Sequence, residues 1–119
     1  IKQFDIRPGE KNIIIKKLSG GNQQKTIVAR EMTKDFSLLL ASQPTRGVDI
    51  GSIEFIHKQI IMARDQKKAI LLVSAELSEI LSLSDRIIVL YKGKIAGQFE
   101  AGKTNEIELG LYMTGAKSN

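Results

Sequence analysis

The 119-residue chain has no cysteine, no tryptophan, one histidine and two prolines. Without cysteine it can form neither disulfides nor thiolate metal sites, which suits a reducing compartment. Aromatic residues make up 5% of the sequence, too few for an extended platform on which nucleic-acid bases could stack. No apolar run approaches the roughly 20 residues that span a bilayer. Any membrane role must therefore come through a partner.

Apolar residues account for 42% of the sequence, which is sufficient for a single core, and the length fits one domain or part of one. The chain carries 18 basic and 13 acidic residues, a net charge of +5. This excess permits contact with nucleic acid or anionic lipid. Because the lysines are scattered, we favour a solvated surface and predict no nucleic-acid partner.

Apolar runs alternate with segments of helical periodicity along the chain. We predict strands at 37–41, 69–74, 86–91 and 94–99, and helices at 22–34, 52–66, 76–83 and 105–114. The first two strands are apolar throughout, which indicates burial on both faces and a mostly parallel sheet flanked by helices. The predicted fold class is α/β. In such sheets ligands gather at the carboxyl ends of the strands, here residues 42–43 and 74–75.

Residues 18–25, LSGGNQQK, are the most informative stretch. Two glycines just before a predicted helix allow the backbone to approach a ligand closely. Ser19 and the N–H groups of the first helical turn would offer donors to an anion. The alternative is an ordinary helix start with Asn22 as its cap. On the residues alone, the ordinary helix start is favoured.

A second stretch, SLLLASQPTRGVDIG at 37–51, is an apolar run that ends in polar, turn-forming residues. Together the two stretches resemble the ABC-transporter ATPases. LSGGNQQK is similar to their signature motif, the apolar run to their Walker B strand, and residues 44–49 to their D-loop. The similarity extends from about residue 4 to residue 97. The forms Asn-Gln-Gln-Lys and Pro-Thr-Arg-Gly most resemble the second of two nucleotide-binding domains in importers of simple sugars and nucleosides.

The resemblance implies a partial P-loop NTPase (RecA-like) core that lacks the Walker A half. The family places its Walker A loop and Q-loop upstream of residue 1. Residues 1–35 would be the remnant of a helical subdomain that carries the signature. Residues 36–119 would be the C-terminal part of the ATPase core. We therefore expect 1–119 to be a single, partial ABC ATPase domain.

Three positions depart from the family pattern. The family strand ends in Asp-Glu, which help to hold Mg²⁺ and orient or deprotonate the attacking water; Ser42 and Gln43 stand at these positions. The family's switch histidine falls on Ala75, which has no polar side-chain atom for a γ-phosphate. A general base alone is worth roughly 10²–10⁴ in rate. We therefore predict a degenerate site with no intact catalytic residue and no metal ligand.

The signature, by contrast, is intact. In ABC ATPases two domains meet head to tail, so the resemblance implies that the signature acts in trans on nucleotide held by the opposite domain. The residues implied are Ser19, Gly20, Gly21 and Gln23. Asp49 in the D-loop is implied to link the two sites. Capping of the helix that follows is an equal alternative for Asp49.

The resemblance also implies ATP and Mg²⁺ in the full-length assembly, with none bound to this chain alone. The implied partners are the first nucleotide-binding domain, transmembrane permease subunits and, indirectly, a solute-binding protein, at the cytoplasmic face of the membrane. The isolated chain is expected to be inactive and to self-associate through an exposed sheet edge and apolar surface. The alternative function is an ABC-type ATPase that acts on nucleic acid or ribosomes. Against it, no heptad pattern flanks the signature.

Residues 97–104, GQFEAGKT, match the phosphate-binding pattern G-x-x-x-x-G-K-[ST]. Phe99 and Glu100 place bulk and negative charge where backbone donors should cradle phosphates. We therefore interpret this match as chance. His57, the only histidine, has no paired ligand in the sequence and is expected to be structural or at the surface.

Overall fold

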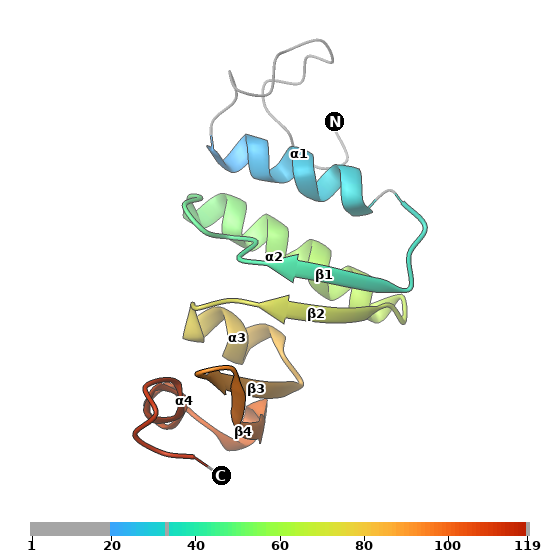
Figure 1. Ribbon diagram of the computed structural model, residues 1–119. Helices are drawn as coiled ribbons and strands as arrows, with labels where there is room; N and C mark the ends of the chain where they lie inside the picture. The colour runs from blue at the N-terminus through green and yellow to red at the C-terminus, as the bar shows by residue number, and fades with distance from the viewer. Residues whose placement is uncertain (1–19, 33, 119) are drawn as a thin grey trace. The chain divides into compact units, whose positions relative to one another are not determined.

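The computed structural model describes residues 20–32 and 34–118 (Figure 1). It confirms the α/β class. The elements in chain order are α1 (Gly20–Met32), β1 (Leu38–Ser42), α2 (Ile50–Asp65), β2 (Ala69–Val73), α3 (Leu77–Leu83), β3 (Arg86–Tyr91), β4 (Lys94–Glu100), η3 (Ala101–Lys103) and α4 (Glu106–Met113). The chain divides into two compact units, Ile1–Val73 and Ser74–Asn119. The predicted subdomain boundary between residues 35 and 36 stays a prediction.

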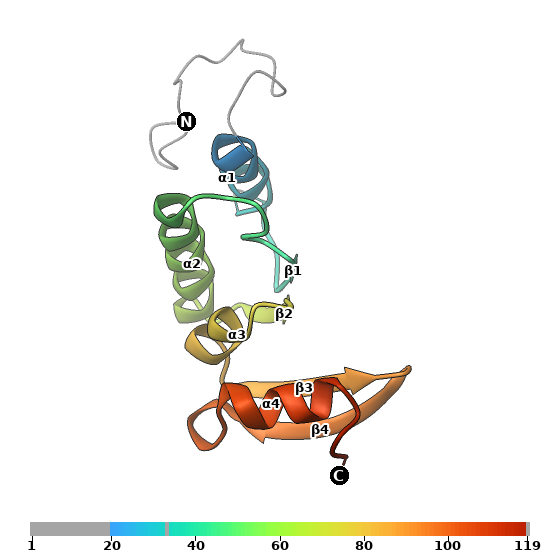
Figure 2. The same ribbon diagram turned by 90° about the vertical axis from the view of Figure 1, so that its left-hand side faces the viewer.

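In the first unit, β1 and β2 form a parallel two-stranded sheet, with Leu38 opposite Ala69 and Ser42 opposite Val73. Parallel neighbours require a crossover, which α2 provides. α2 lies on one face of this sheet (Figures 1 and 2). Its buried positions recur at helical spacing and form one stripe. They are Ser52, Ile56, Ile60 and Ala63.

The opposite face of the β1–β2 sheet is apolar and exposed. Leu38 and Leu40 of β1 are 57% and 64% exposed, and Leu71 and Val73 of β2 are 53% and 47% exposed. These side chains share a face because alternate residues of a strand point the same way and Leu40 lies opposite Leu71. The prediction that both strands are buried on both faces is therefore wrong for the described part of the chain. The covering helix reaches only one face.

In the second unit, β3 and β4 form an antiparallel hairpin, with Tyr91 opposite Lys94. The turn residues Lys92 and Gly93 have φ angles of 47° and 77°. Two consecutive positive φ angles are what a type I′ hairpin turn requires. A two-residue connection can join only antiparallel strands. We expected the strands to form a mostly parallel sheet. Among the described residues, only β1 and β2 pair in parallel.

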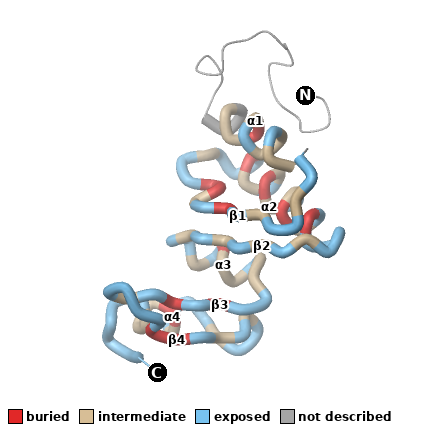
Figure 3. Tube along the Cα trace, turned by 45° about the vertical axis from the view of Figure 1, so that its right-hand side comes forward, coloured by how far each residue is buried: buried red, intermediate tan, exposed pale blue. Residues whose placement is uncertain are grey.

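The core of the second unit lies between the hairpin and α4, which runs along the two strands (Figure 2). Buried positions are drawn in red in Figure 3. The buried hydrophobic residues of this core are Ile87, Val89, Ala96 and Leu109. At the edge of this core, the rings of Phe99 and Tyr112 meet edge to face with their centroids 4.9 Å apart. Such a pair adds roughly 0.5–1.5 kcal/mol to the burial of the two rings.

Residues 97–104 begin in β4 beside this core and do not form a phosphate loop. Gly97 to Glu100 lie in β4, with Gly97 opposite Val89, and the next three residues form η3. Lys103 Nζ lies 3.1 Å from a carboxylate oxygen of Glu100. A phosphate loop instead curls so that successive N–H groups converge on an anion. The chance interpretation of GQFEAGKT is therefore confirmed.

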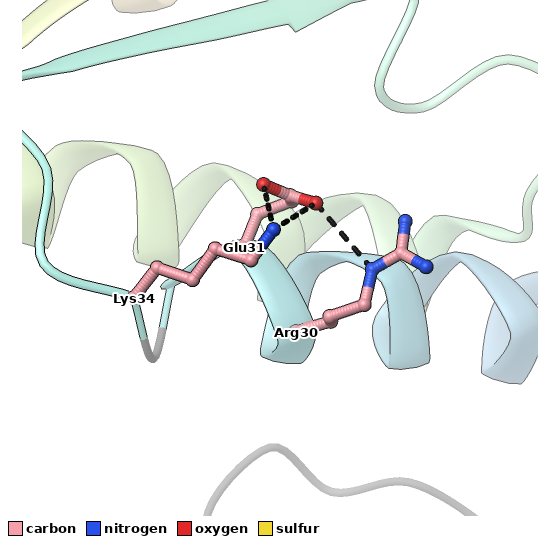
Figure 4. Close-up of polar contacts among 3 residues, drawn as sticks. All are labelled: Arg30, Glu31 and Lys34. Atoms are coloured by element: carbon pink, nitrogen blue, oxygen red, sulfur yellow. Dashed lines mark hydrogen bonds and ion pairs between the residues drawn. The ribbon is translucent and has the colours of Figure 1, made fainter.

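α1 ends in a small group of exposed charges (Figure 4). Arg30 Nε and Lys34 Nζ each lie 3.4 Å from Oε1 of Glu31. Exposed pairs of this kind contribute about 0–1 kcal/mol, because both charges remain hydrated. They therefore do little to place α1, which is held by its packing against α2.

Gly97→Ala is expected to destabilise the second unit by about 1–3 kcal/mol. A Cβ at this position would lie 2.8 Å from Cδ1 of Tyr112 and 2.9 Å from Cε2 of Phe99, so one of the rings must move. The matched control is Gly102→Ala, whose Cβ meets no atom within 4 Å. Urea unfolding of the two variants measures the difference. Equal losses of unfolding free energy in Gly97→Ala and Gly102→Ala would show that the rings do not constrain Gly97.

The isolated chain is expected to associate with itself through the exposed face of the β1–β2 sheet, because association removes apolar surface from water. Replacing Leu40 and Leu71 together by threonine keeps residues that favour strands while reducing the apolar area. Sedimentation velocity should then show a shift toward monomer. Ile107→Thr, which changes an 80% exposed side chain of α4, is the control. An unchanged distribution in the double variant would contradict the expectation.

Candidate functional site

The loop that joins β1 to α2, residues 43–49, begins at the carboxyl end of the parallel sheet and is called the β1–α2 loop below. The N–H of Gln43 donates to the carbonyl of Val73 across 2.7 Å, and the carbonyl of Gln43 accepts from the N–H of Arg46 at 3.2 Å. Gln43 has a φ of 47°, in the left-handed region that few residues other than glycine adopt. The chain therefore leaves β1 in a tight, hydrogen-bonded turn.

α1 contacts this loop and the helix after it. Gln24 Nε2 donates to the carbonyl of Pro44 at 2.5 Å. Lys25 is only 8% exposed, and its Nζ lies 5.1 Å from the centre of the Phe55 ring of α2. A cation at this distance from an aromatic face is attracted to it. Thr45, within the loop, is also buried.

Asp49 ends the loop as the N-cap of α2. Its backbone is extended, and its Oδ1 accepts a hydrogen bond from the N–H of Ser52 at 3.1 Å. Hydrogen bonds from the side chain and backbone of Ser52, with a smaller contribution from the positive charge of Lys25, lower the pKa of Asp49. The capping interpretation is confirmed, and the helix begins at Ile50 rather than near Ser52. The link between two nucleotide sites stays a prediction.

The signature residues that the structure describes lie at the start of α1. Gly20 and Gly21 form its first turn, so the prediction that both glycines precede the helix is wrong. Glycine has no side chain to obstruct this turn, whose N–H groups have no acceptor within the helix. Gln23 follows in the same helix and is partly exposed. Ser19 lies outside the described residues.

The positions predicted to be degenerate lie at or just after the ends of the two strands. Ser42 is the exposed last residue of β1, and Gln43 is partly buried next to it. Ala75 follows Val73 by two residues, is exposed and belongs to the second unit. The sheet register thus brings Ser42 and Gln43 to the end of β2.

The donor set at the end of β1 does not fit Mg²⁺. Ser42 and Gln43 present hydroxyl and amide oxygens without negative charge, whereas Mg²⁺ sites in proteins usually include one or two carboxylates. Within residues 20–32 and 34–118, no three His, Cys, Asp or Glu side chains gather where they could hold a metal ion.

His57 is partly buried on α2. The described helices also include none with the length and apolarity to cross a bilayer.

Gln24 and Lys25 were not among the predicted site residues. One signal was present in the sequence. Lys25 shares a helical face with Val28, Ala29 and Met32, at spacings of three, four and seven residues. A lysine on the apolar face of a helix indicates either a long side chain that reaches solvent or a buried cation with a partner. Only the position of α2 shows that the second case holds.

No family model matches the chain. The nucleoside import ATP-binding protein NupA of Lactococcus lactis is 49% identical over 119 residues, which cover 100% of this chain and 24% of that protein. The glucose import ATP-binding protein TsgD13 of Haloferax volcanii is 47% identical over 98 residues, which cover 82% of this chain and 18% of that protein. A solved dimeric structure of the ATP-binding cassette MJ0796, bound to ADP and Pi, aligns with a TM-score of 0.74 and 25% identity.

The chain is part of an ABC ATPase cassette. The aligned residues cover 84% of the chain and 43% of the MJ0796 chain. The chain also spans about a quarter of the length of NupA. These matches confirm the resemblance and the partial P-loop NTPase fold. The assignments of the signature to the start of α1 and of the D-loop to residues 44–49 stay predictions.

Asp49→Ala is expected to lower the melting temperature at neutral pH, because the N–H of Ser52 loses its acceptor. The folded pKa of Asp49 is below its ordinary value of 3.8. Its charged form therefore stabilises the fold above that value, and this contribution is lost as the pH falls through the folded pKa. Thermal melts should show that the difference in melting temperature between the parent and Asp49→Ala becomes smaller in strong acid.

The control for this measurement is Asp65→Ala, at the C-terminal end of the same helix, where a negative charge opposes the helix dipole. This variant should show no loss of melting temperature. The proposed contribution of the carboxylate would be contradicted if the melting temperatures of the parent and Asp49→Ala differed equally at neutral and strongly acidic pH.

Proposed function

We propose that the chain is the C-terminal part of the second nucleotide-binding domain in the ATP-binding subunit of an ABC importer for simple sugars or nucleosides. The 49% identity to a nucleoside import ATP-binding protein over the whole chain carries this proposal. The partners are the first nucleotide-binding domain, transmembrane permease subunits and, indirectly, a solute-binding protein. The assembly works at the cytoplasmic face of the membrane.

In the proposed mechanism, the signature completes the nucleotide site of the first domain. The N–H groups of Gly20 and Gly21 lie in the first turn of α1, where backbone donors are available to phosphate oxygens. Because glycine has no Cβ, a phosphate can approach this turn closely. Ser19 and Gln23 are assigned to the same contact. ATP with Mg²⁺, held by the opposite domain, supplies the scissile phosphoanhydride.

Ser42, Gln43 and Ala75 are proposed to be degenerate positions that have lost the residues for catalysis. The amide of Gln43 can hydrogen-bond a water molecule but cannot accept its proton. The methyl group of Ala75 cannot hydrogen-bond a phosphate. The loss of a general base costs roughly 10²–10⁴ in rate. Loss of a metal-binding carboxylate removes further stabilisation of the transition state. These positions therefore serve the architecture of the cassette, and the chain alone is inactive.

Two substitutions in the full-length protein test the asymmetry between the sites. Gly21→Asp is expected to abolish ATP turnover, because a carboxylate in the first turn of α1 repels the phosphates and blocks their approach. Gln43→Ala should leave turnover near the parental rate. Release of inorganic phosphate by the assembled transporter measures both.

The matched control is Gly102→Asp, which places the same side chain at an exposed position with no atom within 4 Å of its Cβ. Equal losses from Gly21→Asp and Gln43→Ala would overturn the asymmetric model. Salt-sensitive binding of RNA or DNA by the full-length protein would instead favour the ATPase that acts on nucleic acid or ribosomes.

A further inference from the structure

Two neighbouring residues of α1 reach different parts of the chain around the β1–α2 loop. Gln24 donates through Nε2 to the carbonyl of Pro44, the buried residue near the start of the loop. Lys25 reaches toward Phe55 in α2, and its charge acts on Asp49 at the end of the loop. Consecutive helix residues point about 100° apart, so two adjacent side chains can hold two separate points.

The burial of Lys25 is the informative observation. An ammonium group removed from water costs free energy unless other groups replace its hydration. Here the Phe55 ring, 5.1 Å from Nζ, is one of the groups that provide that compensation. An apolar side chain would fill the same space between α1 and α2 without a desolvation penalty. A buried lysine at this position is therefore better explained by its effect on the loop than by packing alone.

The distance along α1 is short. Lys25 follows Gly21 by four residues, about 6 Å along the helix axis at 1.5 Å per residue. A helix transmits a rigid displacement over that length with little loss, because every intervening backbone hydrogen bond must be kept. The first turn of α1 and the two contacts with the loop region thus lie on one stiff element.

We propose that Gln24 and Lys25 are positioning residues that couple the signature turn of α1 to the β1–α2 loop. Gln24 holds the loop at Pro44, and Lys25 holds α2 at Phe55, in the second turn after the loop. When the signature turn contacts phosphate, the loop moves with it. The proposal rests on the proposed function, because the ligand of the signature turn is the nucleotide of the facing domain.

The test uses the full-length protein assembled with its permease. Lys25→Met removes the charge but keeps an unbranched side chain of similar length, and should lower kcat for ATP hydrolysis roughly tenfold or more through misplacement of the loop. The KM for ATP should change less than kcat, because neither side chain is assigned to the nucleotide. Lys25→Arg keeps the charge and should restore most of kcat. Lys58→Met, on the exposed side of α2, is the matched control.

A double-mutant cycle identifies the route of the effect. If Lys25 acts through the end of the loop, Lys25→Met and Asp49→Asn combined should lower kcat by less than the product of their separate effects. Independent effects, which multiply, would overturn the proposed route. A Lys25→Met variant that loses thermal stability but keeps the parental kcat would show a structural role only, and would also overturn the proposal.

Gly21→Asp separates this proposal from the function on which it rests. If Gly21→Asp abolishes turnover while Lys25→Met hydrolyses ATP at the parental rate, the coupling fails and the trans-acting signature stands. If Gly21→Asp leaves turnover unchanged, the trans-acting signature itself fails, and the coupling fails with it. A loss from both, with rescue by Lys25→Arg, supports both.

Discussion

The parallel pairing of β1 with β2 is the constraint on which the first unit depends. It places Ser42 opposite Val73 and allows the Gln43 N–H to donate to the Val73 carbonyl, which turns the chain sharply at the sheet edge. The β1–α2 loop begins with this turn and ends at Asp49, which is the N-cap of α2. α2 then covers one face of the sheet and offers the surface on which α1 packs. α1 is thus placed by contacts between segments distant in sequence.

The second unit is built from more local contacts. The Lys92–Gly93 turn pairs strands that are adjacent in sequence, and α4 follows within a few residues to cover the hairpin. In both units one sheet face carries exposed apolar side chains, such as Leu40 in the first and Leu90 in the second at 64% and 67% exposure. The aligned residues cover only 43% of the MJ0796 cassette, so that cassette has further segments that can cover such faces.

Much of the fold was predictable, since a continuous apolar run such as AILLV is typical of a strand and Lys-Gly between two runs indicates a turn. The misses share one cause. Apolar periodicity shows which residues favour burial, but not whether a covering element is present, so Leu38 and Leu71 were wrongly assigned to a two-sided core. The same limit applies to Lys25, whose partner Phe55 is 30 positions away and becomes its neighbour only when α1 meets α2.

By itself, the sequence determined the α/β class, the positions of the helices and strands, the family resemblance and the absence of carboxylates at Ser42 and Gln43. These are properties of residue type and spacing, which do not depend on how the chain folds. Tertiary structure decided that Gly20 and Gly21 lie inside α1 and that Asp49 caps α2. It also decided that Gln24 reaches the β1–α2 loop and that Lys25 reaches Phe55 of α2. These features depend on where the hydrogen bonds of a helix begin or on which distant segments come into contact. The local sequence pattern predicts neither of these two things.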